Sequence, residues 1–359
     1  MSEHNTTSRC AIGVDLGKKR SKVCVMENGV VTREFEVTGT KTAFQRAFGS
    51  LPRHRVILEV GAMSPWVSRT LSEMDFRVIV VAATTLKDCF SKGRRKNDRD
   101  DARGLAQIAV SCPEMLRVVE HRSEHAQRDL ARLHVRATLV EERTRLINTV
   151  RGMLGSLGVQ LPTCSTAAFV KRVHSTLAKG GEDATLVEPL LRQIEGATKS
   201  IRDLEKEIEA LAQERYPAIK TLTQVHGVGT QTALTFMLTV TDPKRFRKNR
   251  TIGSYLGLVP AQYQSGDSNP QLRITKAGNT ELRCLLVQCS QFILGRFGKE
   301  SDLRRFGLAM AARGGPRSKK RAVVAVARRL AVLLLSLWRT GEIYEPLRNE
   351  RLRGATLSA

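Results

Sequence analysis

Four acidic residues in the first third of the chain have the type and spacing needed for metal-dependent chemistry. Asp15 and Glu59 each stand at or near the end of a short apolar run. Asp98 and Asp101 are three residues apart at the start of a helical pattern, so they share one helix face. Any one of these acids alone is more often a helix cap or a solvated charge. Together, the four positions indicate a carboxylate cluster.

Such a cluster needs a cation, because adjacent carboxylates repel one another. Oxygen-only ligands favour Mg²⁺ or Mn²⁺. Two such ions, about 3.5–4 Å apart, stabilise the attacking and leaving oxygens of a phosphodiester. We therefore predict a Mg²⁺ or Mn²⁺ site at Asp15, Glu59, Asp98 and Asp101, and interpret the intervening Asp100 as a solvated charge.

The elements that must position these acids follow from the apolar pattern of residues 8–118. Strands are predicted at 10–15, 21–26, 30–37, 55–60 and 78–82, and helices at 41–48, 65–74 and 98–110. The pair Asn28-Gly29 between the second and third strands is typical of a two-residue hairpin turn. A hairpin followed by alternating helices and strands predicts a mixed sheet with helices on its faces.

The charge balance indicates a polyanionic partner. The 359 residues include 59 Lys and Arg against 35 Asp and Glu, a formal charge of +24. The surplus is +7 over residues 1–118, +1 over 119–218 and +14 over 219–345. Lys and Arg displace condensed counterions from nucleic acid, whereas the alternative is a basic protein kept soluble by its charge. With aromatic residues at 5%, contacts to the phosphate backbone fit better than base stacking.

Other compositional features exclude a membrane protein and a disulfide framework. No run of about 18 uncharged apolar residues exists, because Arg328-Arg329 interrupts the longest candidate, and the first residues contain no apolar leader. The seven cysteines include no CxxC pair. A reducing cytoplasm, without a membrane partner, is therefore expected.

The middle of the chain, residues 119–218, is predicted to be a helical coiled-coil arm. Apolar residues between Val187 and Leu211 alternate in steps of three and four for more than three heptads. Residues 162–183 are expected to join two antiparallel long helices. Such a pair is most often an oligomerisation arm, and the alternative is an intramolecular hairpin that spaces two domains. The predicted divisions are 8–118, 119–218, 219–345 and a basic tail, 346–359.

The last large segment is predicted to be mainly helical and to contact nucleic acid. Gly227-Val228-Gly229, between two apolar helical runs, resembles a helix-hairpin-helix element, although a plain helix–helix turn fits the pattern too. Basic residues around it are candidates to hold phosphates. The candidate nucleic-acid-binding residues are Gly227, Gly229, Lys244, Arg245, Arg247, Lys248, Arg273, Lys276, Arg283, Lys319 and Lys320.

Both outer segments resemble known families. The pieces IGVDLGKK, VILEVGAM and KNDRDDARGLA resemble the RNase H-like (RuvC-like) fold of Holliday-junction resolvases. The series LTQVHGVGTQTALTFM, YLGLVPAQYQSGDSNPQLRITKAGNTELRCLL and KKRAVVAVARRLAVLLLSLW is similar to the C-terminal domain of DEDD transposases of bacterial insertion sequences, a group that includes the Piv-type DNA invertases. The resemblance covers about residues 8–345.

This resemblance implies a serine nucleophile. The SG motif of the family falls on Ser265-Gly266, so Ser265 would attack DNA and form a covalent phosphoserine intermediate. A serine hydroxyl needs activation, which the metal-bound carboxylates could supply. By spacing alone, Ser-Gly in a polar loop is more often a turn, and Ser268 is the main competitor for the role.

The resemblance also implies the partners. They are donor and target DNA, and a guide RNA from the non-coding end of the element that would pair with both, as in other RNA-guided systems. Because a helix of about 30 residues spans about 45 Å, we expect Ser265 and the acids to meet between subunits of a homodimer or homotetramer. The implied location is the bacterial cytoplasm, on the nucleoid.

Two alternatives remain open at this point. A Holliday-junction-type endonuclease would use the four acids with water as nucleophile, and would keep cleaving after Ser265→Ala. A non-catalytic nucleic-acid-binding scaffold would lose no activity after Asp15→Ala or Ser265→Ala. Neither explains why both halves of the proposed chemistry occur in one chain.

Overall fold

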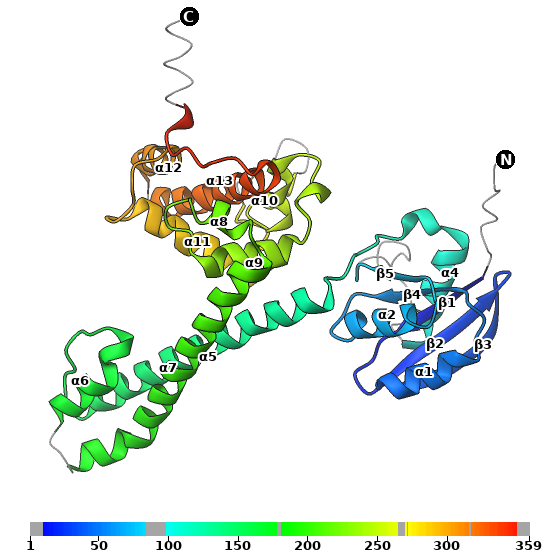
Figure 1. Cartoon of the computed structure of the whole chain (residues 1–359), viewed down its shortest axis with the longest axis horizontal. Coiled ribbons are helices and arrows are strands. Elements are labelled where there is room, and N and C mark those ends of the chain that lie inside the picture. Colours follow the sequence, from blue (N-terminus) through cyan, green and yellow to red (C-terminus); the bar gives the residue numbers. More distant parts are fainter. Residues whose placement is uncertain are drawn as a thin grey trace, which may run out of the picture. The chain divides into compact units, whose positions relative to one another are not determined.

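The chain forms two compact units, Met1–Ser123 and Glu124–Ala359 (Figure 1). The computed structural model describes residues 10–83, 98–177, 181–264, 270, 272–315 and 317–349, without the side chains of Asp98 and Arg99. Among these residues, no helix is long and apolar enough to cross a membrane.

The N-terminal unit is a five-stranded mixed sheet with helices on both faces (Figure 1). The sheet order is β3-β2-β1-β4-β5, in which β1, β2 and β3 are antiparallel neighbours and β1, β4 and β5 run parallel. Asn28 and Gly29 have φ values of 54° and 81°, which confirms the predicted hairpin turn. In chain order the elements are β1 (Cys10–Asp15), β2 (Arg20–Glu27), β3 (Val30–Thr38), α1 (Lys41–Gly49), β4 (Arg55–Glu59), α2 (Ser64–Ser72), β5 (Val78–Val81), α4 (Asp98–Ser111) and the short η1 (Pro113–Met115).

The two faces of this sheet have different covers. Alternate residues of a strand point to opposite faces. Ile12 and Val14 of β1 pack with Phe44 of α1 and Leu71 of α2 on one face. On the other face, Ala11 packs with buried residues of α4, at whose start the remaining two acids stand.

Gly13 allows the backbone of α4 to touch β1. A Cβ atom at Gly13 would lie 2.0 Å from the carbonyl oxygen of Ala102 and 2.7 Å from the nitrogen of Ala106. Ala109, farther along α4, packs against Ala11, which precedes Gly13 in β1. The helix therefore runs opposite to β1, and its first turn lies toward the end of the strand that carries Asp15.

Gly13→Ala is expected to destabilise the packing of α4 by about 3 kcal/mol or more, because the obstacle is backbone and cannot rotate away. The measurement is hydrogen exchange of α4 together with thermal unfolding of the full chain. Gly49→Ala is the control, because Gly49 ends α1 and has open space around its Cβ position. Equal protection of α4 in the wild type and Gly13→Ala would contradict this account.

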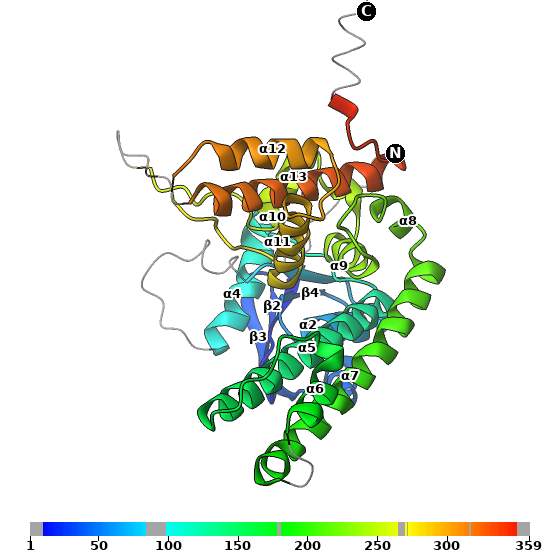
Figure 2. The same cartoon turned by 90° about the vertical axis from the view of Figure 1, so that its left-hand side faces the viewer.

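The C-terminal unit is helical. Its long helices α5 and α7 form an antiparallel pair, and α12 lies beside α13 (Figure 2). In chain order the elements are α5 (Glu124–Ser156), η2 (Thr166–Ala168), α6 (Phe169–Thr176), α7 (Glu182–Arg215), α8 (Ile219–Leu222), α9 (Thr230–Val240), η3 (Pro243–Arg245), η4 (Asn249–Thr251), α10 (Ile252–Tyr255), α11 (Thr280–Leu294), α12 (Asp302–Ala312) and α13 (Ser318–Thr340).

The predicted heptad stripe of α7 is buried within one chain. Val187 and Ile194 pack with residues of α5 and α6, and Leu190 is partly buried against the same cluster. Ile208 joins Leu130 of α5 in the core of the C-terminal helices. An intramolecular hairpin therefore accounts for the stripe without a second subunit. It also explains why the arm and residues 219–345, which the sequence analysis separates, belong to one compact unit.

A buried carboxylate fastens the two long helices where they join this core. Asp129 of α5 is 1% exposed. It accepts a hydrogen bond of 2.8 Å from the Tyr216 hydroxyl and ion pairs with Arg132 and Arg215. Burial and this hydrogen bond raise the pKa of Tyr216, so the phenol stays protonated as a donor.

Candidate functional site

Asp15 and Glu59 stand side by side at the ends of adjacent parallel strands. Val14 pairs with Leu58 in the β1–β4 register, and the two acids are the next residues of β1 and β4. Neighbouring strands lie about 4.8 Å apart. Because Val14 and Leu58 belong to the core under α1 and α2, the half-buried acids belong to the opposite face, which α4 covers.

The other two predicted acids lie on α4. Asp101 is half-buried and immediately precedes Ala102, which packs on the sheet. Asp98 begins the helix, and its side chain lies outside the described residues. Also on α4, Arg103 forms a bidentate pair with Glu34 of β3, with 2.9 Å between Nη2 and Oε2. The helix is thus fixed to the sheet by packing and by a charged pair.

The donor chemistry of these acids suits Mg²⁺ or Mn²⁺. All four are carboxylates, two on adjacent strand ends and two in the first turn of the helix that covers them. Within the part of the chain that the structure describes, no group of three or more His, Cys, Asp or Glu side chains is arranged to hold a metal ion. The carboxylates therefore match a divalent metal in donor chemistry and in the face of the fold they share, whereas the described side chains of Asp15, Glu59 and Asp101 do not by themselves form a metal-binding group.

Ser265 and its competitor Ser268 also lie outside the described residues, but both ends of their loop are described. Pro260 and Ile274 form an isolated antiparallel bridge. Ala261 N–H donates to the Arg273 carbonyl, and Thr275 N–H donates to the Val259 carbonyl, each over 2.9 Å. The segment with the SG motif is thus joined to a short paired base on the C-terminal helices.

The structure contradicts the predicted role of Arg283. The sequence suggests a phosphate-binding cation, but this side chain is 8% exposed. Its guanidinium donates to the carbonyls of Leu256 and Ala277 over 3.1 and 2.8 Å, and to Thr280 Oγ1 over 3.1 Å. Arg283 therefore fastens the turn before α11 and has no exposed face for DNA.

The glycines of the helix-hairpin-helix-like element occupy different environments. Gly227 has φ +93°, and a Cβ there would lie 3.0 Å from the Phe292 ring and 3.3 Å from Ile293, so a packing role explains it. Gly229 is the exposed N-cap of α9. The preceding helix, α8, has only four residues.

The remaining predicted cations are on the surface of the C-terminal unit. Lys244, Arg245, Arg247 and Lys248 are exposed between α9 and α10. The guanidinium of Arg245 lies over the Tyr255 ring, 5.1 Å from its centroid. In α13, Lys319 and Lys320 are exposed in the first turn.

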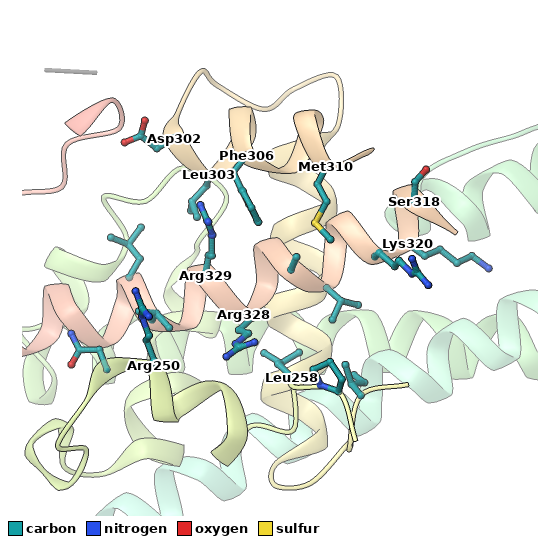
Figure 3. Close-up of a pocket in the computed structure, with 18 of the residues that line it drawn as sticks. Arg250, Leu258, Asp302, Leu303, Phe306, Met310, Ser318, Lys320, Arg328 and Arg329 are labelled. Carbon is teal, nitrogen blue, oxygen red and sulfur yellow. The ribbon is translucent and has the colours of Figure 1, made fainter. Parts of the chain in front are cut away.

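A basic groove lies beside α13, and only some of its lining cations were predicted from the sequence (Figure 3). This groove, of about 1640 Å³, is bounded by α12, α13, residues of the segments 249–260 and 272–276, and the chain at 344–349. Arg273, Lys276 and Lys320, three predicted cations, line it. The spacing of basic residues along α13 could have revealed Arg321, Arg328 and Arg329, whereas no local pattern predicts the lining cations outside this helix. The additional lining cations are Arg250, Arg313, Arg317, Arg321, Arg328, Arg329 and Arg348.

Comparisons with known proteins match both units. Residues 12–158 match the DEDD-type IS110 transposase model, and residues 219–305 match that of the transposase IS116/IS110/IS902 family. The chain is 30% identical to a probable family 20 transposase of Pseudomonas aeruginosa, over 93% of this chain and 98% of that one. It is 27% identical to the transposase for insertion sequence element IS1111A of Coxiella burnetii, over 93% and 90%. A pilin gene-inverting protein of Moraxella lacunata is 26% identical over 34% of this chain and 38% of its own.

Proposed function

Because the chain belongs to the IS110/IS116 family of insertion-sequence transposases, we propose that it cuts and rejoins DNA strands with a carboxylate-held metal and a serine nucleophile. The observation that carries the metal half is the pairing of Asp15 and Glu59 at adjacent strand ends, on the face covered by α4. The sheet order, with antiparallel β1–β3 and parallel β1, β4 and β5, supports an RNase H-like arrangement.

The four carboxylates are proposed to bind the divalent metal. Asp15, Glu59, Asp98 and Asp101 would hold Mg²⁺ or Mn²⁺, which supplies a positive charge for the phosphodiester oxygens. The sheet fixes two of these acids, and the close packing of α4 on Gly13 fixes the helix that carries the others. Rigid placement matters, because catalytic groups must be held in their productive geometry.

Ser265 is proposed to attack the scissile phosphodiester of DNA. Its Oγ forms a bond to the scissile phosphorus, the bond from phosphorus to one nucleoside oxygen breaks, and the serine proton ends on that leaving oxygen through solvent. The phosphoserine keeps the energy of the diester, so a nucleoside hydroxyl can reverse the step on a new strand. The SG motif and the paired base of its loop support this assignment.

The partners of this reaction are donor and target DNA. A guide RNA from the element would pair with both DNAs, and in a homodimer or homotetramer the serine of one subunit would act with the carboxylates of another. The charge of +24 supports nucleic-acid binding. The α7 stripe packs largely against α5 and α6 of the same chain, so the stripe alone does not require a second subunit.

Removal of divalent metal is expected to abolish both cleavage and adduct formation. Labelled donor DNA is incubated with the protein and total RNA from cells that carry the element, then run on a denaturing gel, with Mg²⁺ or with EDTA. A protein-linked DNA band in Mg²⁺ that disappears in EDTA supports the proposal, and its sensitivity to RNase tests the guide. Equal adduct yield in EDTA would contradict the metal assignment, and cleavage without any adduct would favour water as the nucleophile.

A further inference from the structure

The basic groove beside α13 has a charged rim that its own chain does not neutralise. Ten Lys and Arg side chains line it against two acids, Asp302 and Glu345. Among the described residues, Arg250, Arg321 and Arg328 have no carboxylate partner, and all three are exposed. Arg348 pairs with Glu342, and the remaining surplus of cations in this concave site indicates an anionic occupant.

Two of the arginines are held in place by local packing. Arg329 of α13 lies over the Phe306 ring of α12, with 3.3 Å between its guanidinium carbon and the ring centroid. Arg328 passes close to Gly253, where a Cβ would lie 3.0 Å from its Nε. Figure 3 shows Phe306 and Met310 extending from α12 toward α13, where Arg328 and Arg329 stand. Stacking on the Phe306 ring restricts the orientation of the Arg329 guanidinium, which suits a defined ligand better than a diffuse ion cloud.

The floor of the groove is apolar, which narrows the class of anion. Leu258, Leu303, Phe306, Met310 and Val332 all contribute to the lining. A DNA duplex presents sugars and phosphates outward and keeps its bases stacked inside, so an apolar floor would gain nothing from it. An unpaired strand carries phosphates on one side and apolar base faces on the other, and both would be satisfied here.

We propose that this groove holds an unpaired DNA strand while strands are exchanged, with phosphates on the arginines of α13 and bases against the floor of α12. This inference rests on the proposed function, which requires strands to separate from their duplex. The floor also favours DNA over RNA. A ribose 2′-hydroxyl buried against Leu303, Phe306 and Met310 would lose its water without gaining a partner.

Binding of labelled probes to the full chain tests this inference. The probes are a thymidine oligonucleotide, the uridine oligonucleotide of equal length, and a duplex of the same length, all in EDTA so that no cleavage occurs. The thymidine strand is expected to bind more tightly than either of the others. Tighter binding of the uridine strand, or binding of the duplex as tight as that of the thymidine strand, would overturn the proposal.

Two variants separate the rim from the floor. Arg321→Glu is expected to weaken strand binding by about tenfold or more and to reduce its salt dependence. Met310→Gln keeps the side-chain length and is expected to weaken strand binding about fivefold, which is roughly 1 kcal/mol, with unchanged salt dependence and unchanged duplex binding. Lys199→Glu, an exposed cation of α7 outside the groove, is the charge control.

Three results would refute the groove assignment. They are an effect of Lys199→Glu as large as that of Arg321→Glu, unaltered strand binding by Met310→Gln, and competition by polyglutamate as effective as that by the unlabelled strand. These measurements need neither metal nor cleavage. A result that refutes strand binding in the groove would therefore not contradict the proposed roles of the carboxylates and Ser265. Conversely, strand binding to the groove could be found in a protein that forms no adduct.

Discussion

Ser265→Ala is expected to abolish the covalent protein–DNA product and the rejoined DNA, with activity falling by at least about 10³-fold. The physical reason is that removal of Oγ removes the atom that is proposed to bond to phosphorus. Binding of donor DNA should persist, because the phosphate-binding cations are unchanged. The measurement is the denaturing-gel adduct assay in Mg²⁺, with DNA binding measured in parallel by a mobility shift.

Ser268→Ala is the matched control, because it removes the same atom three residues away in the same loop. It should retain adduct formation. If Ser268 and not Ser265 were required, the nucleophile would be reassigned within the loop. If Ser265→Ala still cut DNA at the wild-type rate, the protein would be a nuclease that uses water, and the covalent mechanism would be wrong.

The elements that carry the predicted acids could be read from the sequence. Strand and helix bounds between Cys10 and Ser111 agree with the predicted ranges within about two residues, as expected where the apolar pattern is regular. Asn28-Gly29 marks its turn because both positions need positive φ. The heptads of α7 predict a buried stripe, but a one-dimensional pattern does not say which chain supplies the partner helix.

The environments of single residues could not be predicted, because they depend on contacts between distant segments. Arg283 looks like one more cation in a basic stretch until the carbonyls of Leu256 and Ala277 converge on it. In the sequence, Gly13 is one small residue in a strand. Only the structure shows that the backbone of α4 packs so closely on Gly13 that no Cβ atom fits there. The basic groove combines segments from Asn249 to Asn349, so no local motif describes it.

Asp15→Asn is expected to lower strand cleavage by at least about 10³-fold while donor DNA remains bound, since electrostatic stabilisation by the metal is among the largest catalytic contributions. Asparagine keeps the size of aspartate and removes its charge.

The metal dependence of thermal unfolding gives a readout that needs no DNA. A ligand that binds only the folded state raises stability by an amount that grows with its concentration. Wild-type protein should therefore melt at a higher temperature as Mg²⁺ or Mn²⁺ is added, whereas Asp15→Asn should show a much smaller rise. Asp100→Asn is the control, because it removes a charge from the same first turn of α4 outside the proposed metal set. The structure corrects the expectation that Asp100 is solvated, since its side chain is half-buried and its charge acts on Arg103. The variant should keep the metal-dependent rise in melting temperature and the wild-type cleavage rate. If Asp15→Asn kept the full metal-dependent rise, the metal would bind elsewhere, and the carboxylates at the ends of β1 and β4 would lose their assigned role.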